Sequence, residues 1–227
     1  MSEPLSKSEI ATRYGEIPAE RFMPVKFHRR CVELMRPHLR SGAAVIDLGC
    51  GHGTLLACLA SLPVKLELHG CDLSPKLVES ARSRVRGARI VEADLENLVF
   101  TSASFDAVFA TEVLEHLLDV QKGLAEIHRV LKPGGWLLVT LPNRDWFHIE
   151  RYLRERTKFQ PVDDHFYSVS EMEALLAQAG LPVRRVRGGE NLYFGGGLPR
   201  LFEKLALAIY PRLHRRMKRM MLLAQKN

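Results

Sequence analysis

The chain has 227 residues, of which 46% are hydrophobic and 26% are charged. These proportions are typical of a globular protein with one sizeable core, and they exclude a disordered chain, a collagen-like repeat and a disulfide-stapled miniprotein. The formal net charge is +7. Residues 198–227 account for all of it, because the rest of the chain holds equal numbers of basic and acidic side chains. The basic excess therefore belongs to the C-terminal segment and does not indicate a surface that coats nucleic acid.

No targeting signal is recognisable near the start of the sequence. The first ten residues lack a basic patch followed by an apolar stretch, and no window approaches the eighteen or so uncharged apolar residues of a membrane span. The four cysteines form neither a CxxC pair nor a zinc-binding spacing. We therefore expect a cytoplasmic protein whose thiols are reduced.

Hydrophobic patterning predicts helices and strands in alternation. Residues 1–20 have little pattern and are expected to form a loose lead-in, and residues 24–39 have the apolar spacing of an amphipathic helix. Strands are predicted at 43–48, 64–73, 88–95, 105–111, 136–141, 182–188 and 220–226. Helices are predicted between them at 54–62, 74–86, 120–131 and 170–179. This alternation indicates a parallel α/β sheet with right-handed crossovers, in a single domain.

Residues at helix starts and turns sharpen these boundaries. Ser74 followed by Pro75 is typical of a helix N-terminus. Ser170 with Glu173 three residues later predicts a capping box for the helix that Gly180 ends. Residues 132–135 predict the turn that leads into the fifth strand.

A glycine-rich run, Asp47 to Gly53, lies where the first buried strand turns into a helix. Glycine lets the backbone approach a ligand, and ligands of open parallel sheets bind outside the carboxyl ends of the strands. Asp72 and Asp94 end the next two strands. A carboxylate at the first position can accept both hydroxyls of a ribose, and one at the second can accept the amino group of an adenine. The three strand ends together predict a nucleoside ligand.

The glycine spacing argues against a dinucleotide. A dinucleotide site needs GxGxxG or GxGxxA, whose third small residue lets the helix pack closely over a pyrophosphate. Thr54 stands in that place when counting from Gly49, and Leu56 when counting from Gly51. A phosphate-binding P-loop is also absent, because no Gly-Lys-Ser/Thr follows.

Several ordered segments resemble the class I S-adenosylmethionine-dependent methyltransferases. They are VIDLGCGHG (45–53), GCDLSP (70–75), EADLENLVF (92–100), FDAVFATEVLEHLLD (105–119) and RVLKPGGWLLVTLPN (129–143). In detail the chain is similar to the small-molecule branch that includes the ubiquinone-biosynthesis methyltransferases. The resemblance implies a doubly wound, mostly parallel seven-stranded sheet in a three-layer α/β/α, Rossmann-like arrangement. Its implied strand order is 3-2-1-4-5-7-6, with the seventh strand antiparallel.

The resemblance also implies S-adenosyl-L-methionine as the cofactor and a division of the single domain 1–227. Residues 1–42 would be a helical lead-in, 43–143 the cofactor-binding half and 144–227 the acceptor half. The implied cofactor-binding positions are Asp47, Gly49, Cys50, Gly51, His52, Gly53, Asp72, Leu73, Asp94, Leu95, Thr111 and Glu112. Residues 47 and 49–53 would hold the methionine part, residues 73 and 95 would flank the adenine, and residues 111–112 would lie near the transferred methyl group.

His116 is the expected catalytic base, because it follows the fourth strand on the side that the resemblance assigns to the methyl group. His52 and His165 are its rivals, and a capping or supporting histidine is the alternative. Glu112, Glu115, His116 and His165 also resemble a divalent-metal site of small-RNA 2′-O-methyltransferases. ExxEH occurs in family members without metal too, and we expect no metal here.

The C-terminal part is expected to form the acceptor pocket and its lid, over about residues 144–217. It holds ten of the seventeen aromatic residues, with glycines 195–197 as a hinge. Its basic, amphipathic segment 198–219 could contact an anionic membrane, cap a lipophilic pocket, or form an ordinary helix.

We therefore expect methyl transfer to a small, apolar or aromatic acceptor, with no nucleic-acid partner. The alternatives are a metal-assisted RNA ribose 2′-O-methyltransferase and a non-catalytic, S-adenosylmethionine-binding regulatory module. Steep weakening by salt would distinguish an RNA acceptor from a small one.

Overall fold

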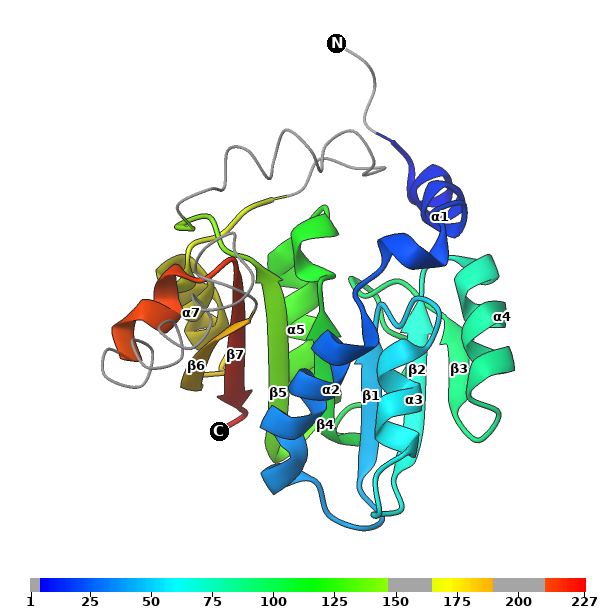
Figure 1. The fold of residues 1–227 in the computed structure, drawn as a ribbon, viewed down its shortest axis with the longest axis horizontal. Coiled ribbons are helices and arrows are strands. Elements are labelled where there is room, and N and C mark those ends of the chain that lie inside the picture. The colour runs from blue at the N-terminus through cyan, green and yellow to red at the C-terminus, as the bar shows by residue number, and fades with distance from the viewer. Residues whose placement is uncertain (1–4, 147–164, 190–210) are drawn as a thin grey trace, which may run out of the picture.

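A computed structural model of the protein describes residues 5–146, 165–189 and 211–227. One sheet of seven strands crosses the molecule, in the order β3-β2-β1-β4-β5-β7-β6 (Figure 1). The strands are β1 Ala44–Leu48, β2 Glu67–Asp72, β3 Arg89–Glu92, β4 Phe105–Thr111, β5 Leu131–Pro142, β6 Val183–Gly189 and β7 Arg219–Gln225. β7 runs antiparallel to both of its neighbours, whereas the pairs from β3 to β5 are parallel. The predicted fold class and strand order are confirmed.

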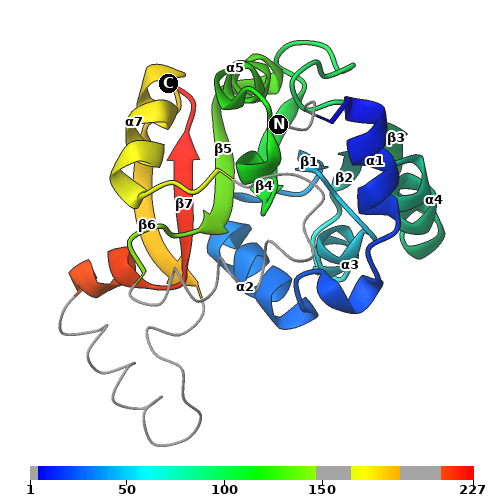
Figure 2. The ribbon, with the colours of Figure 1, turned by 90° about the horizontal axis from the view of Figure 1, so that it is seen from above.

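Helices cover both faces of the sheet (Figure 2). The described α-helices are α1 Lys7–Gly15, α2 Val25–Met35, α3 Thr54–Ala60, α4 Pro75–Arg84, α5 Val120–Val130 and α7 Val169–Gln178. Short 3₁₀ turns are η1 Ala19–Arg21, η2 Arg36–His38, η3 Leu114–His116 and η4 Pro211–Arg216. α5 and α7 pack on one face, and α2, α3 and α4 pack on the other. The molecule is therefore the predicted three-layer α/β/α sandwich.

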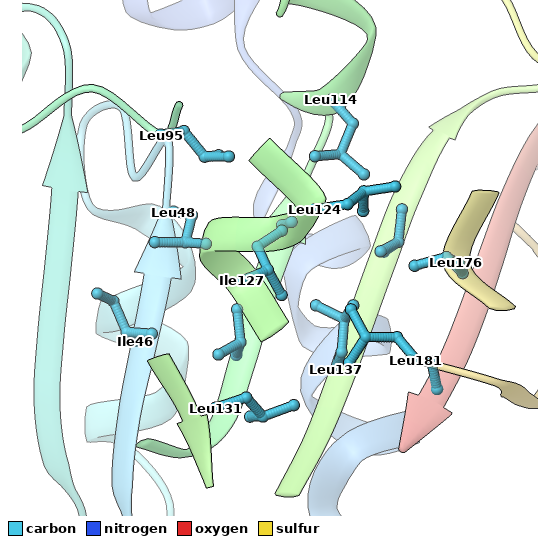
Figure 3. Packing of buried hydrophobic residues seen from close by; sticks show 14 of the residues in the cluster. Ile46, Leu48, Leu95, Leu114, Leu124, Ile127, Leu131, Leu137, Leu176 and Leu181 are labelled. Carbon is cyan, nitrogen blue, oxygen red and sulfur yellow. The ribbon is translucent and has the colours of Figure 1, made fainter. Parts of the chain in front are cut away.

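The two faces of the sheet have separate cores because successive side chains of a strand point to opposite sides. In β1, Ile46 and Leu48 pack toward α5, whereas Val45 packs toward α2 and α3. Figure 3 shows Leu124 and Ile127 of α5 directed at the strands beneath them. β1 is buried along its whole length, which explains its continuous apolar sequence.

Three local predictions need correction. The expected loose lead-in contains α1, which Ser6 and Glu9 cap reciprocally. α7 begins one residue earlier than predicted, and its capping box lies two residues earlier, because Ser168 and Glu171 form it in place of Ser170 and Glu173. Both sites carry the same Ser-x-x-Glu pattern, so sequence alone could not choose between them.

The predicted turn at residues 132–135 is the third correction, because it lies within β5. Leu131 pairs with Phe105 of β4, and the next paired residue of β5, Trp136, pairs with Ala107. Five residues of β5 are thus matched by two residues of β4. The turn residues are therefore an insertion that interrupts the ladder without ending the strand.

We expect Ile127→Ala to lower the free energy of unfolding by about 2–5 kcal/mol, because Ile127 is fully buried between α5 and the sheet. Urea denaturation of the two proteins measures the difference. Leu118→Ala is the matched control, because Leu118 is 56% exposed and its truncation should cost little. A loss below about 1 kcal/mol for Ile127→Ala would contradict this packing.

Candidate active site

A cavity of about 710 Å³ opens at the carboxyl edge of the sheet. Its floor comes from the residues that follow β1, β2, β3 and β4, and its walls come from the N-terminal residues 10–28 and the start of β7. This volume is typical of pockets that hold cofactors or drug-sized ligands. Its position is the one that open parallel sheets favour for ligands.

Almost all of the predicted site residues line this cavity. They are Asp47, Gly49, Cys50, Gly51, His52, Asp72, Leu73, Asp94, Leu95, Thr111, Glu112 and His116. Gly53 does not line it. Gly53 precedes α3 with φ +74°, and a Cβ atom there would lie 3.1 Å from Ala81 of α4. Gly53 thus serves the turn and the packing between helices.

The loop after β1 requires glycine at two of its positions. Gly49 has φ +67°, and a Cβ atom on it would lie 2.6 Å from the Val113 side chain. Gly51 has φ +51°, and its N–H donates to Asp72 Oδ2 over 2.9 Å. The loop therefore exposes backbone to the cavity and at the same time positions a carboxylate of the next strand.

Asp72 is held from two directions at the end of β2. Besides the bond from Gly51, its Oδ1 accepts the N–H of Ser74 over 3.0 Å. Burial raises the pKa of Asp72, and the bonds from these backbone N–H groups oppose that shift. The carboxylate is therefore fixed in orientation before any ligand binds.

Asp47 is the most deeply buried of these acids, with 1% of its surface exposed. Its Oδ1 has no hydrogen-bond partner among the residues that the structure describes. Burial raises the pKa of Asp47 well above its usual range, and the nearby charge of Asp72 adds to the shift. A buried carboxylate of this kind is stabilised by a cation or a strong donor in the cavity.

Asp94 is engaged by a residue that the sequence did not point to. Its Oδ2 forms an ion pair with Nζ of Lys7 in α1, and its Oδ1 accepts the N–H of Glu96 over 3.0 Å. Lys7 also donates to Glu96 over 2.9 Å. The Lys7 contacts thus hold α1 at the end of the cavity where Asp94 lies, the carboxylate that is predicted to accept the adenine amino group.

The N-terminal residues form a wall that sequence reasoning missed. Ile10 and Tyr14 of α1 line the cavity, followed by Ile17, Phe22 and Met23. The Phe22 ring would lie 3.1 Å from a Cβ atom on Gly51, so it closely covers the glycine loop. The capping pair Ser6 and Glu9 could have revealed α1, although nothing in the pattern places it over the cavity.

Glu112, at the end of β4, has an unusual backbone and a firmly held side chain. Its φ is +54°, a left-handed conformation that costs a non-glycine residue on the order of 1–3 kcal/mol. Its carboxylate forms an ion pair with Arg219 of β7 and accepts the Thr140 hydroxyl over 3.1 Å. Such strain is typical of functional sites, where the surrounding structure holds the residue in place.

His116 lines the cavity from η3, as predicted for a base. Its Nε2 lies 3.9 Å from Oε1 of the fully buried Glu115, and its ring centroid is 5.3 Å from that of Tyr14. The rival His52 contacts Ser80 Oγ over 2.7 Å through Nδ1. The other rival, His165, is exposed and does not line the cavity.

The structure gives no support to a metal at these residues. The Glu112 carboxylate already contacts Arg219 and Thr140, and His165 approaches Glu115 through a bond between backbone atoms, N–H to carbonyl, over 2.8 Å. Within the described parts of the chain, no three His, Cys, Asp or Glu residues are grouped so that they could hold a metal ion.

Of the predicted acceptor half, the structure describes residues 144–146, 165–189 and 211–227, and the hinge at 195–197 lies outside them. Of its ten aromatic residues, only Trp146, Phe166 and Tyr167 are described, and none of these three lines the cavity. The aromatic wall comes instead from Tyr14 and Phe22 near the N-terminus.

The basic segment 198–219 is described only from residue 211 onward, and there its charges contact the protein itself. Arg215 pairs with Glu173 of α7 over 2.5 Å, and Arg219 pairs with Glu112. These contacts give no support to binding at an anionic membrane. No helix in the described ranges is long and apolar enough to cross a bilayer.

Comparisons with known proteins show which proteins this chain resembles. Residues 46–139 match the family model described as a methyltransferase domain. The chain is 34% identical over 140 residues to a demethylmenaquinone methyltransferase of Thermus thermophilus, a match that covers 58% of this chain and 62% of the relative. It is 29% identical over 200 residues to a ubiquinone biosynthesis O-methyltransferase of Thiobacillus denitrificans, covering 80% and 83%. The chain spans between a third and three fifths of the length of several other curated relatives that it matches.

Solved structures share the whole architecture. An S-adenosylmethionine-dependent methyltransferase of Mesorhizobium loti matches with a TM-score of 0.64 at 22% identity, over 86% of this chain and 96% of that one. The fold is therefore that of the class I methyltransferases. Residues 46–139 match a methyltransferase domain, and the names of curated relatives indicate S-adenosylmethionine as its cofactor. The buried Asp47 fits this cofactor, which carries an ammonium and a sulfonium charge.

We expect Asp72→Ala to weaken binding of S-adenosylhomocysteine by at least about 10-fold, because the variant loses a charged acceptor for ribose hydroxyls and two backbone N–H groups lose their partner. Isothermal titration calorimetry measures the affinity. Asp106→Ala is the control, since it removes a carboxylate at the amino edge of the sheet, where β4 begins. Equal affinities for the native protein and Asp72→Ala would disprove the assignment.

His28, buried in the cavity wall, provides a test by pH. Burial lowers the pKa of His28 from 6.5 to about 4. As pH falls from about 6.5 toward 4, the unfolded chain binds a proton there that the folded chain does not, so folded stability decreases. We expect His28→Gln to lose less stability than the native protein between pH 7 and pH 5 in urea denaturation. Identical losses would show that His28 titrates normally.

Proposed function

We propose that this protein transfers the methyl group of S-adenosylmethionine to a small, apolar or aromatic acceptor. The observation that carries the proposal is the row of carboxylates, Asp47, Asp72 and Asp94, along one wall of a single cavity. The relatives named for ubiquinone and menaquinone biosynthesis support a ring-shaped acceptor. The apolar and aromatic side chains of Ile10 and Phe22 support it as well.

The chain's own residues divide the binding of the cofactor among them. Asp47 would receive the ammonium group, the backbone at Gly49 and Gly51 would contact the methionine part, and Asp72 would accept the ribose hydroxyls. Asp94 would accept the adenine amino group, either beside Lys7 or in its place, because a carboxylate oxygen can accept more than one donor.

Bound S-adenosylmethionine supplies an already activated methyl group, so the protein mainly has to position the acceptor and exclude water. The N-terminal wall, with Ile10 and Phe22, would limit access of water to the cavity. His116 would accept the proton when the acceptor atom carries one. Tyr14 and Glu115 lie against His116 and would hold its ring in position.

An RNA acceptor has less support. That alternative depended on the basic C-terminal segment and on a metal site at residues 112–116. Arg215 and Arg219 are paired within the protein, and Glu112 is held by Arg219. A small acceptor is therefore the better proposal.

Radiolabelled methyl transfer into fractionated cell extract tests the proposed function. We expect label in a small, nuclease-resistant product, and Asp72→Ala should lower the rate of its formation at cofactor concentrations that just saturate the native protein. Label that nuclease releases from a polymer would establish the RNA alternative. Cofactor binding without label in any fraction would favour the non-catalytic module.

With the labelled product in hand, His116→Gln tests the base. We expect the rate to fall by about 10²–10⁴-fold for an acceptor that carries a proton, with cofactor affinity unchanged. His128→Gln, in α5 and away from the cavity, is the matched control. If His116→Gln transfers the methyl group at the native rate, His116 is not the base and has a structural role.

A further inference from the structure

Four basic side chains lie near one another at the edge strand β6, outside the cofactor cavity. They are Arg185 and Arg187 of β6, Arg30 of α2 and His214 of η4, and none of them lines the cavity. β6 pairs only with β7 and forms one edge of the sheet (Figure 1). We call these four residues the edge cluster. The methyltransferase site gives no reason for their proximity.

A bulge in β6 decides which face its arginines occupy. Arg184 is an extra residue between the paired positions 183 and 185. Beyond it, Arg185 pairs with Leu223 of β7 and Arg187 pairs with Met221. Residues that pair directly across two strands share a face of the sheet, and both of these partners pack in the core beneath α2. Arg185 and Arg187 therefore lie on the face that α2 covers.

His214 connects η4 to the end of β6 and offers a fixed donor. Its Nδ1 accepts the N–H of Gly188 over 3.1 Å. A neutral imidazole that accepts at Nδ1 carries its proton on Nε2, so the Nε2–H group is a donor. Burial lowers the pKa of His214, and the charges of Arg187, Arg30 and Arg185 lower it further. All three guanidinium groups therefore lie close to one imidazole.

No acid balances this charge among the residues that the structure describes. There, none of the four side chains forms an ion pair, in contrast to Arg215 and Arg219. Burial and the charge of Arg185 lower the pKa of Arg187, as expected for cations that repel one another. Arg187 Nη1 donates to the Val186 carbonyl over 3.2 Å, and a guanidinium has five N–H donors, so others remain for a ligand.

We propose that the edge cluster binds the phosphate group of a small phosphorylated molecule, at a site separate from the cofactor cavity. A guanidinium meets two phosphate oxygens with parallel N–H bonds. A phosphate dianion balances two of the three guanidinium charges, whereas a carboxylate balances one. Arg185 and Arg187 are two residues apart on one face, about 7 Å along the strand, which their long side chains allow a phosphate to bridge.

The compactness of the edge cluster favours a small ligand over a polymer. Its three guanidinium charges surround one imidazole, whereas the phosphates of a nucleic acid are spread along the backbone. The neighbouring Arg184 does not extend the cluster along β6, because its Nη2 donates to Asn227 Oδ1 over 3.1 Å.

Titration with inorganic pyrophosphate tests the proposal. At pH 7.5 and 50 mM NaCl, calorimetry on the full chain should show one saturable site with a dissociation constant below about 1 mM. Arg187→Met should weaken binding by about tenfold or more, because it removes charge-assisted hydrogen bonds. Arg30→Met, at an exposed position of α2 where the change does not threaten folding, should weaken binding as well.

Arg184→Met is the matched control. It removes the same charge from the same strand, at an exposed position where the side chain contacts Asn227. Its affinity for pyrophosphate should stay within about twofold of the native value, because an exposed charge outside the site is screened. The imidazole resonance of His214, identified by its loss in His214→Gln, should shift with the same midpoint as the calorimetric signal.

Three results would each overturn the proposal. They are the absence of saturable pyrophosphate binding, a native affinity in Arg187→Met, and equal losses in Arg187→Met and Arg184→Met. A single-stranded oligonucleotide that binds tightly and that pyrophosphate does not displace would overturn it too, and would make the edge cluster a nucleic-acid contact.

The same titration on protein saturated with S-adenosylhomocysteine separates this site from the cavity. We expect an unchanged affinity for pyrophosphate, because the edge cluster lies outside the cavity. Loss of pyrophosphate binding would place the anion in the cavity and overturn the proposal. Failure of the edge cluster to bind phosphate would leave the proposed methyl transfer untouched, and the reverse also holds.

Discussion

Burial of the Asp47 carboxylate is the constraint around which the site is organised. β1 is an interior strand of the sheet, paired with β2 and β4, and its buried sequence leaves a carboxylate in a place with little solvent. Removing a charge from water is costly unless a cation or donors compensate. The glycine loop that follows β1 keeps the space above Asp47 open, so that a cationic ligand can supply the compensation that the described residues do not.

Two segments far from this strand in sequence complete the cavity. α1 reaches it through Lys7, which joins the acids at positions 94 and 96, and β7 reaches it by running against the other strands. Glu96 also accepts the N–H groups of Leu118 and Asp119. Glu96 therefore connects the N-terminal helix to the loop that follows His116.

Local patterns in the sequence predicted the strands and most of the cavity floor, because the relevant residues lie in short segments. Asp72 is an example, since it directly ends an apolar strand. The strand order was predicted from the resemblance to the methyltransferases. Lys7, Phe22 and Arg219 could not be found in this way, because their positions depend on packing and strand direction across long separations. The predicted position of the α7 capping box was wrong for a different reason. Two equivalent Ser-x-x-Glu patterns overlap, and only tertiary contacts select Ser168 as the N-cap residue.

The left-handed backbone at Glu112 lowers stability, and a change that relieves this strain would remove the Glu112 carboxylate from the site. Glycine would adopt that conformation without strain, yet it would leave the Arg219 guanidinium buried beside no carboxylate, a cost that exceeds the strain relieved. A more thermostable protein would therefore require both positions to change together, with an uncharged residue replacing Arg219. Selection for heat resistance alone would favour that double change and would remove an acidic group that lines the cavity, which is the trade-off common in enzymes whose active sites store strain.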